Sequence, residues 1–477
     1  HHEDDSQAPE GTLCVELPHH HRPPPTAPGP PRHADHMPVQ TDADYRSLEA
    51  PVANLEGVKD RSQRTKLGFW QVVFMVSNGM IGPVILVVPY SFFLVGIHGW
   101  TMYVFAFFMF WFTGHLLYKA QISQEGRLIP TFPEIGGALI GPKGRDVVGG
   151  SITIELLGLC SAFVVIIGDN LVKVQPLLPF GVELSKATWI LIFAIGVTPS
   201  VLMQNYTLLA EMSKIGVLVC FSIPCLVILT HLVYPVATYM EPHEIAIEGP
   251  SFQWENLPLA MGIVSVAYTT HAVFPTVVAE MKDVKEFPKA LEISFGVVTL
   301  FYLLAGAGFY IYGKATDPQI TFNLPERMQY VVSYAIIITI CLKFALMINP
   351  VVLFVEKTCR NNGRLVSLLC IDPKSPEGTP IKPVRIVLVA SCVLAALLIP
   401  YIALIHSVVG VFWSTFVCVV LPCVLALQLR NWLPIQYAAI WGLLGLSTVM
   451  MFTGLYQNIL QIKSCYDGTN AYENMCN

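Results

Sequence analysis

The chain has 477 residues, of which 54% are hydrophobic and only 13% are charged. Soluble domains carry about 25% charged residues, so this composition excludes an ordinary soluble protein and predicts an integral membrane protein. The net charge of −5 is small, and the basic residues are divided among short segments between apolar runs. This distribution gives no support for nucleic-acid binding.

The first segment, residues 1–66, is expected to be a disordered cytosolic tail. It is rich in histidine and contains the run RPPPTAPGPP, and such sequence cannot bury an apolar core. Within it, Tyr45-Arg46-Ser47-Leu48 matches a tyrosine-based sorting signal. The expected partner of that signal is a sorting adaptor, and the alternative is a chance match of four residues.

About eleven apolar spans follow the tail and make up a predicted transmembrane domain over residues 67–462. A helix needs roughly 20 apolar residues to cross a bilayer, and these runs come close to that length. The predicted spans are 71–95, 99–120, 147–172, 187–204, 214–236, 256–279, 291–312, 328–356, 384–404, 408–429 and 436–460. Residues 463–477 are left as a C-terminal tail, in which Cys465 and Cys476 are near enough in sequence to pair if the tail is not cytosolic.

The Lys and Arg residues near the span ends predict the orientation of the bundle. With the N-terminus in the cytosol, most of them fall on the cytosolic side, including those in segments 59–66, 282–289 and 357–385. The acidic loop at 240–256 then lies on the other side. An odd number of spans places the C-terminal tail outside the cytosol as well.

The first span is interrupted in its middle, where the sequence reads SNGMIGPVILVVPYSF. Glycine and proline both disfavour a continuous helix. Backbone groups freed in hydrocarbon must be satisfied by protein or by a wet cavity, and helices broken at mid-membrane are typical of transport sites. Ser77, Asn78, Gly79 and Gly82 are therefore candidate substrate-binding residues.

The sixth span, 256–279, is interrupted in the same way. Its middle is polar, with Tyr268, Thr269 and Thr270 ahead of a proline at 275, and these three residues are the second set of candidate substrate contacts. Each broken span opens a set of five, so the two sets run in opposite directions. Interrupted spans at matching positions of inverted halves indicate a site for a ligand with a carboxylate and an ammonium; two proline-kinked structural helices are the alternative.

Several blocks in the same order resemble the amino acid/auxin permease family, also called the amino acid transporter transmembrane family. They are the first-span block quoted above, SVAYTTHAVFPTVVAEMKDVKEFPKAL around the sixth span, and IPYIALIHSVVGVFWSTFVCVVLPCVLAL across the ninth and tenth. FPEIGG, IELLGLC and GDNLVKVQP resemble its vacuolar and vesicular inhibitory amino acid transporter branch. Where the family has Gly-Thr-Gly, this chain has Gly82-Pro83-Val84, so proline keeps the break while a hydroxyl is lost.

The resemblance implies an all-α polytopic membrane protein with a LeuT-like five-plus-five inverted repeat and one extra span. It also implies secondary active transport of amino acids, coupled to protons in the vacuolar and vesicular branch. A vacuolar, lysosomal or vesicle membrane is the expected location, with the plasma membrane as the alternative.

Ionisable residues inside the spans are the candidates for proton or cation coupling, because charge is costly in a membrane and marks function there. They are Lys343 in the eighth span, Glu155 in the third and His271 in the sixth. The Lys343 ammonium is expected to replace a coupling cation beside the first span, or to carry the proton itself. Each of the three has a structural alternative, a buried polar group satisfied by a neighbouring helix. Asp169 is expected at a span end, paired along the helix with Lys173.

The sequence therefore predicts an amino acid transporter in the lipid bilayer, which needs an ion gradient and no cofactor. The alternative is a membrane receptor that senses an amino acid and moves little of it. An enzyme is not expected, because the spans contain no nucleophile elbow, no HExxH, no phosphate loop and no metal-spaced His/Cys cluster.

Overall fold

The computed structural model describes residues 66–122, 128–177, 183–202, 206–238, 254–362, 365–366, 380–398, 408–429 and 432–467. The possible sorting signal at 45–48 and Cys476 lie outside these residues, as do the rest of the N-terminal tail up to 65 and residues 468–477 of the C-terminal tail. No β-strand is present in the described ranges, and the single isolated bridge joins Leu67 to Met281.

Within the described residues, the first half of the domain begins with a broken helix, which five further α-helices follow. Its elements are α1 (Phe69–Met80), η3 (Pro83–Leu86), α2 (Val88–Val95), α3 (His98–Ile122), α4 (Phe132–Ile140), α5 (Pro142–Val174), η4 (Gln175–Leu177), α6 (Lys186–Leu202), α7 (Tyr206–Val233) and η5 (Val236–Thr238). Glycines with positive φ follow α2 and α4, at Gly96 (φ 61°) and Gly141 (φ 95°). Such a conformation ends a helix and is accessible to glycine at little cost.

The second half again begins with a broken helix. Its elements are η6 (Trp254–Asn256), α8 (Leu257–Ala267), α9 (Phe274–Ala279), η7 (Val284–Glu286), α10 (Phe287–Tyr312), η8 (Gly313–Ala315), η9 (Ile320–Asn323), α11 (Glu326–Asn361), α13 (Lys382–Leu398), the π-helical turns η10 (Val409–Ser414) and η11 (Phe416–Val420), α15 (Leu421–Leu427) and α16 (Pro434–Asp467).

Seven segments of the described chain are long and apolar enough to cross a membrane. They are His98–Ile122, Pro142–Leu177, Thr207–Val233, Val284–Ala315, Glu326–Asn361, Val409–Leu427 and Pro434–Leu460. Shorter apolar helices lie at Lys186–Leu202 and at α8. None of the separate pieces α1, α2, α8 and α9 is long enough to cross a membrane by itself, so the total of eleven spans stays a prediction.

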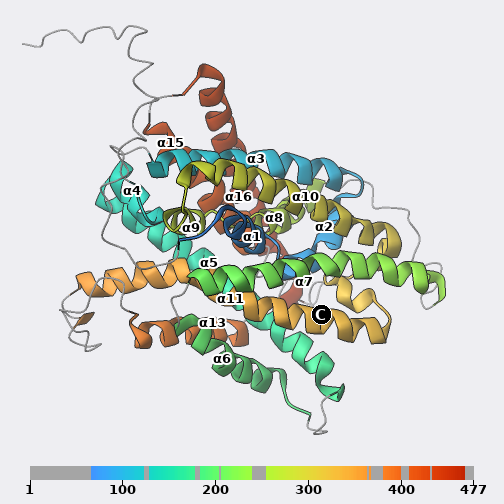
Figure 1. Cartoon of the computed structure of the whole chain (residues 1–477). Coiled ribbons are helices and arrows are strands. Elements are labelled where there is room, and N and C mark those ends of the chain that lie inside the picture. The colour runs from blue at the N-terminus through green and yellow to red at the C-terminus, as the bar shows by residue number, and fades with distance from the viewer. Residues whose placement is uncertain are drawn as a thin grey trace, which may run out of the picture. The chain divides into compact units, whose positions relative to one another are not determined.

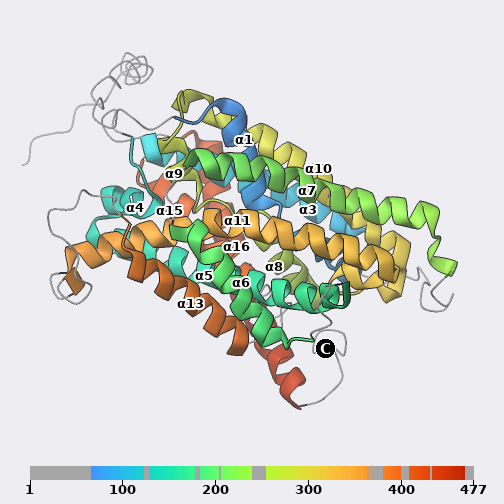
Figure 2. The ribbon, with the colours of Figure 1, turned by 60° about the horizontal axis from the view of Figure 1, so that its bottom comes forward.

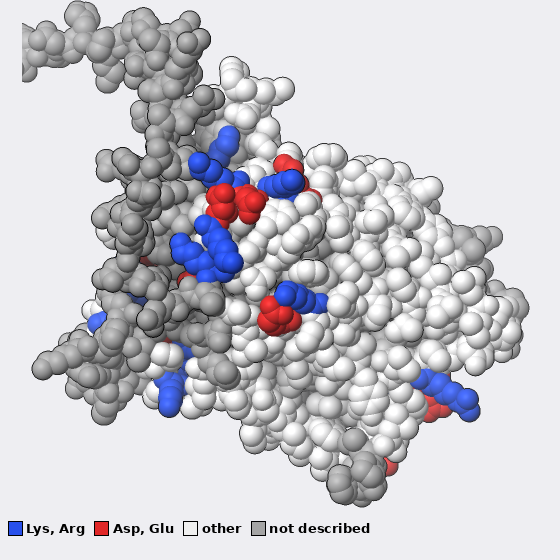
Figure 3. Space-filling model, viewed as in Figure 1, with Lys and Arg blue, Asp and Glu red and all other residues white. Residues whose placement is uncertain are grey.

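The outer surface is that of a protein surrounded by lipid. Large apolar side chains point outward from several long helices, for example Ile195 on α6 (76% exposed) and Ile435 on α16 (77% exposed). Figure 3 shows one face on which charged side chains gather mainly at the left, while most of the rest carries none. A multi-pass membrane protein is the architecture that combines such a surface with an apolar core.

The broken helix α1–α2 lies in the middle of the bundle, as Figure 1 shows. α1 packs against α7, α10 and α11, while α2 packs against α8 and α10. α6 and α13 pack on each other at the periphery, which Figure 2 shows from a second direction. Both helix interruptions predicted from the sequence are thus buried at the centre, and nearly every residue of the first one is inaccessible.

The start of α1 is tied to the end of the second broken helix by backbone hydrogen bonds. The Leu67 amide donates to the Glu280 carbonyl (2.8 Å), and the Lys282 amide donates to the Leu67 carbonyl (2.9 Å). One turn further on, the Gln71 side chain donates to Glu211 on α7 (3.3 Å). These contacts close the bundle at the end where α1 begins.

Asp169 makes a different contact from the expected one. It forms an ion pair with Lys186 on α6 (Oδ1 to Nζ, 2.5 Å), while the Lys173 ammonium lies 5.9 Å from the centre of the Tyr330 ring on α11. The i, i+4 spacing with Lys173 was the only pairing visible along the chain. α6 packs against α5 and brings Lys186, in its first turn, to Asp169.

Candidate functional site

The two interruptions have the geometry that their glycines and prolines predict. α1 ends at Met80, Ile81 and Gly82 are extended, and η3 restarts the chain at Pro83. α8 ends at Ala267, and α9 begins at Phe274 with a proline in its first turn. Proline suits a first turn because its missing amide proton would have no partner there.

The interruptions touch each other at Gly79 and Thr270. A Cβ atom placed on Gly79 would overlap the Thr270 methyl group, and it would lie 3.2 Å from the Thr270 hydroxyl. Only a glycine allows the two segments to come this close. The last turn of α1 and the non-helical segment 268–273 therefore form one continuous surface inside the bundle.

Two polar atoms near the interruptions are buried and have no hydrogen-bond partner among the described residues. They are the Asn78 amide oxygen and the Thr270 hydroxyl. The Asn78 amide nitrogen is engaged, since it donates to the Ser213 hydroxyl on α7 (3.3 Å). The Asn78 oxygen faces the same helix, since a Cβ atom on Gly216 would lie 2.6 Å from it. Buried polar atoms are nearly always satisfied in folded proteins, so each of these two atoms is available to a polar group of a ligand.

The carbonyl groups at the ends of the half-helices are held by side chains from other helices. The Tyr302 hydroxyl on α10 lies within hydrogen-bond distance of the carbonyl oxygens of Met80 (2.9 Å) and Ala267 (2.7 Å). The Lys343 ammonium on α11 donates to the Ile81 carbonyl (3.2 Å). A helix C-terminus carries partial negative charge, so a cation and a hydroxyl donor are both stabilising there.

Lys343 is almost completely buried, with 2% of its surface exposed. Its ammonium lies 5.5 Å from the centre of the Phe163 ring on α5, and a Cβ atom on Gly82 would overlap it. The lysine thus connects α11 to the first interruption through a backbone carbonyl.

Glu155 is the second ionisable candidate for proton coupling. It is fully buried on α5, one carboxylate oxygen accepts from the Cys418 thiol (3.9 Å), and the other has no partner in the described part of the chain. Glu155 is therefore a buried acid that contacts η11 through one sulfur atom.

His271 is held by α3. Its Nε2 lies 3.1 Å from the Phe110 carbonyl and 3.0 Å from the Thr113 hydroxyl, and because a carbonyl only accepts, Nε2 must carry the proton. Nδ1 is buried and finds no partner within the described residues. The imidazole thus anchors the end of the non-helical segment to α3.

Three of the candidate substrate contacts have their own partners. The Tyr268 ring is stacked between Phe110 and Phe295 (centroids 5.5 and 5.8 Å away), and its hydroxyl bonds to Thr299 (2.7 Å). The Thr269 hydroxyl donates to the Ser265 carbonyl (2.8 Å). The carbonyl of Ser77 accepts from the Ile81 amide (2.8 Å). Their roles as substrate contacts stay predictions.

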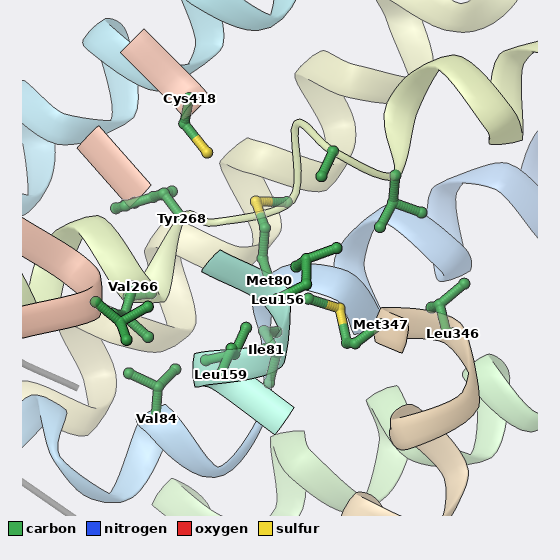
Figure 4. Packing of buried hydrophobic residues seen from close by; sticks show 14 of the residues in the cluster. Met80, Ile81, Val84, Leu156, Leu159, Val266, Tyr268, Leu346, Met347 and Cys418 are labelled. Atoms are coloured by element: carbon green, nitrogen blue, oxygen red, sulfur yellow. The ribbon is translucent and has the colours of Figure 1, made fainter. Parts of the chain in front are cut away.

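The surroundings of the first interruption are apolar. Met80, Ile81 and Val84 belong to one buried cluster with residues of α5, α8 and α11, and Figure 4 shows this packing around the labelled side chains. A crevice beside it is lined by η3, α2, α7, α10 and η9, and its residues are also apolar or uncharged. The site therefore combines two polar helix breaks with hydrocarbon walls.

The sequence model of the family described as "transmembrane amino acid transporter protein" matches residues 65–460. The chain belongs to this family. The resemblance inferred from the motifs is thereby confirmed, and the members of this family are transporters, not enzymes.

Among its relatives, amino acid transporter AVT1D of Arabidopsis thaliana is 29% identical over 376 residues, which are 76% of this chain and 64% of that protein. The vesicular inhibitory amino acid transporter of Rattus norvegicus is 24% identical over 413 residues, which are 82% of this chain and 77% of that protein. The chain thus spans less than two thirds of the length of AVT1D.

Two solved structures have the same fold. MhsT in complex with L-phenylalanine aligns with a TM-score of 0.54 at 13% identity, over 83% of this chain and 100% of that one. Mhp1, a nucleobase-cation-symport-1 family transporter in a closed conformation with bromovinylhydantoin bound, aligns with a TM-score of 0.53 at 11% identity, over 83% of this chain and 91% of that one. The predicted all-α, LeuT-like transporter fold is confirmed.

Tyr302 and Ser213 are contacts of the interruptions that were not predicted from the sequence. Tyr302 is one of several tyrosines in long apolar runs, and Ser213 is a single serine next to a predicted span end. Neither position has a pattern that marks it. The one available signal was a polar aromatic residue in the middle of the predicted span 291–312, where an interfacial belt does not explain it.

Proposed function

We propose that this family member is a secondary active transporter of amino acids that works by alternating access at the contact between the α1 and α8 interruptions. The observation that carries the proposal is the contact of two broken helices at Gly79 and Thr270, where the buried Thr270 hydroxyl has no partner among the described residues. The neighbouring Asn78 also has an unpaired buried oxygen. The Thr270 hydroxyl can donate to the carboxylate of an amino acid beside the freed backbone. The Asn78 oxygen only accepts, so it suits an N–H donor of the substrate.

The ammonium group of the substrate is expected to bind at the helix ends. The carbonyls of Met80 and Ala267 carry the partial negative charge of two helix C-termini, which favours an ammonium. The apolar walls around Met80, Ile81 and Val84 favour an amino acid with an uncharged side chain, because a charged one would lose its hydration there without gaining a partner.

The orientation and the membrane are part of the same proposal. The N-terminus is placed in the cytosol because Lys and Arg concentrate on that side. An organellar or vesicle membrane is favoured, since one relative is named a vesicular transporter. Closure at the start of α1, where Leu67 is bonded to Glu280 and Lys282, would then be closure on the cytosolic side.

Exchange in proteoliposomes tests the transport function. Purified protein is reconstituted into vesicles preloaded with each amino acid of a panel, and uptake of the labelled amino acid is followed with and without an imposed pH gradient. Counterflow stimulated by the gradient is the expected result. Binding of an amino acid without exchange would contradict transport and would favour the sensing receptor.

We propose that Lys343 couples transport to protons. Its ammonium donates to the Ile81 carbonyl at the break, which is where a coupling cation would stabilise the end of α1. Lys343→Met keeps the length and the apolar contacts of the side chain but cannot carry a proton. We expect this variant to retain exchange of the substrate at equilibrium while uptake becomes independent of pH between about pH 5 and 8.

The same pH series distinguishes the other two candidates. Glu155→Gln and His271→Gln replace the carboxylate and the imidazole with an amide that does not titrate. Both variants are expected to preserve the dependence of uptake on pH. If the Lys343→Met variant keeps a normal pH profile while one of these two loses it, the coupling role belongs to that residue and the assignment to Lys343 is wrong.

A further inference from the structure

Tyr302 occupies a position between the two broken helices that no other described side chain shares. It comes from the middle of α10, it is fully buried, and its hydroxyl oxygen lies within hydrogen-bond distance of the last carbonyls of both α1 and α8. Its ring packs against Tyr103 (centroids 5.7 Å apart) and Tyr268 (5.5 Å). These rings fix the direction in which the hydroxyl points.

The Tyr302 hydroxyl cannot satisfy both of these carbonyl groups. A tyrosine hydroxyl carries one hydrogen, so it can donate a full bond to Met80 or to Ala267 but not to both, whereas each carbonyl oxygen and the phenol oxygen have lone pairs to spare. The helices stop at these residues, and so the amides of a next turn are not placed to donate to them. The neighbouring Ile81 carbonyl is already served by Lys343.

Three oxygen acceptors therefore gather where two negative helix ends meet. Such a set suits a donor-rich cation, and a primary ammonium group carries three N–H donors. We propose that Tyr302 is a specificity-determining residue: its oxygen accepts one hydrogen bond from the substrate's primary ammonium, and its hydroxyl holds one of the two carbonyls that accept the others. This inference rests on the proposed function, because it assigns the amine pole of the same site.

A consequence concerns the class of amine. An N-methylated amino acid has two N–H donors, so it would leave one of the three oxygens without a partner in a dry site. Sites built to hydrogen-bond an N–H group discriminate strongly against analogues that lack it. The protein is expected to bind a primary amino acid at least about tenfold more tightly than its N-methyl derivative, since hydrogen bonds to charged groups are worth that much or more.

The test is a binding measurement on the full-length protein in detergent. The twenty proteinogenic L-amino acids are screened, and the most tightly bound primary amine is compared with its N-methyl derivative. In Tyr302→Phe, which removes only the hydroxyl, we expect the dissociation constant of the primary amine to rise about 10- to 100-fold, with a much smaller change for the N-methyl derivative. The preference for the primary amine should therefore largely disappear.

Tyr103→Phe is the matched control. Tyr103 is an equally buried tyrosine of the same aromatic cluster, and its hydroxyl bonds to Ser91 on α2 (3.1 Å) rather than to a broken helix end. It should leave the amine preference intact. A wild-type protein without any preference for the primary amine overturns the inference without any need for a variant.

Two other outcomes would also overturn it. If Tyr302→Phe weakens both ligands equally, the hydroxyl only ties the helices together. If it weakens neither, the ammonium binds elsewhere. The proposed transport function is judged separately: binding with normal selectivity but no counterflow would reject transport and keep the role of Tyr302, whereas a protein that binds no amino acid would reject both.

Discussion

Replacing Arg385 with alanine is expected to lower the free energy of unfolding by about 3–5 kcal/mol, the usual cost of leaving one partner of a buried ion pair alone. The side chain is 1% exposed, and its guanidinium donates to both carboxylate oxygens of Glu356 (2.7 and 3.3 Å). It also donates to the Val201 carbonyl on α6 (2.8 Å). The variant would therefore unpair a buried carboxylate and disconnect α13 from two neighbouring helices.

A residue next to Glu356 provides the control. Lys357 forms an ion pair with Glu134 (2.9 Å), but its side chain is 52% exposed, and such surface pairs contribute about 0–1 kcal/mol. Lys357→Ala should thus scarcely change the midpoint of thermal or denaturant unfolding measured in the same detergent. Equal destabilisation by the two alanine variants would show that the Arg385 pair is not the stabilising contact.

The double variant Glu356→Leu/Arg385→Leu tests whether the unpaired carboxylate causes the loss of stability. It removes both charges, so no unpaired carboxylate remains, and replacing a buried ion pair by apolar groups is often close to neutral. We expect it to be more stable than Arg385→Ala alone. A double variant that is less stable than the single one would mean that the hydrogen bond from the Ile381 amide to Glu356 (2.8 Å), which only the double variant loses, outweighs the cost of the unpaired carboxylate.

This pair also marks a limit of the sequence. Arg385 was assigned only to the charged residues that set orientation, because it stands at a span end, and nothing along the chain connects it to Glu356, which lies 29 positions earlier. The breaks were predictable for the opposite reason. Gly82-Pro83 and Pro275 act locally, through missing donors and missing side chains, so their effect on a helix does not depend on the rest of the fold.

The direction of side chains was the least predictable feature of the site. Tyr268 lies next to the second break, as expected, yet its ring is stacked between Phe110 on α3 and Phe295 on α10. In a regular helix, the periodicity assigns a face to each residue, but a residue just past a helix end has no such periodicity. Tyr302 shows the converse, since a distant helix supplies a hydroxyl that the broken segments lack.

Gly82→Ala is expected to reduce pH-driven uptake by about 10-fold or more without unfolding the protein. The backbone at Gly82 has φ −160°, a value open to any residue, so the effect is steric. A Cβ atom would overlap the Lys343 ammonium and would lie 3.2 and 3.3 Å from the lysine Cδ and Cε. The tip of a lysine moves easily, so the chain should fold while the ammonium loses the Ile81 carbonyl, a charge-assisted bond of roughly 1.5–3 kcal/mol.

Gly296→Ala is the control for a glycine-to-alanine change in a membrane helix away from the interruptions, at an exposed position. Gly296 lies inside α10, and a Cβ atom there would meet no atom within 4 Å. Alanine is the better helix former by roughly 0.5–1 kcal/mol, so this variant should transport normally and unfold no earlier than the wild type. A loss of uptake in Gly296→Ala would mean that added methyl groups impair the bundle in general.

The combination of Gly82→Ala with Lys343→Met decides whether the glycine acts through the lysine. Changes at residues that share one interaction are not additive, whereas independent effects add in free energy. Because the alanine is expected to act only by displacing the ammonium, it should cause little further loss once position 343 is methionine, and both single variants should lose the dependence of uptake on pH. Independent, multiplicative losses in the double variant would show that Gly82 contributes to transport by another route, for instance by exposing its own backbone to the substrate. The measurement is initial uptake at matched protein content over the same pH series, so that a defect in folding, which lowers all rates alike, is separated from a defect in coupling.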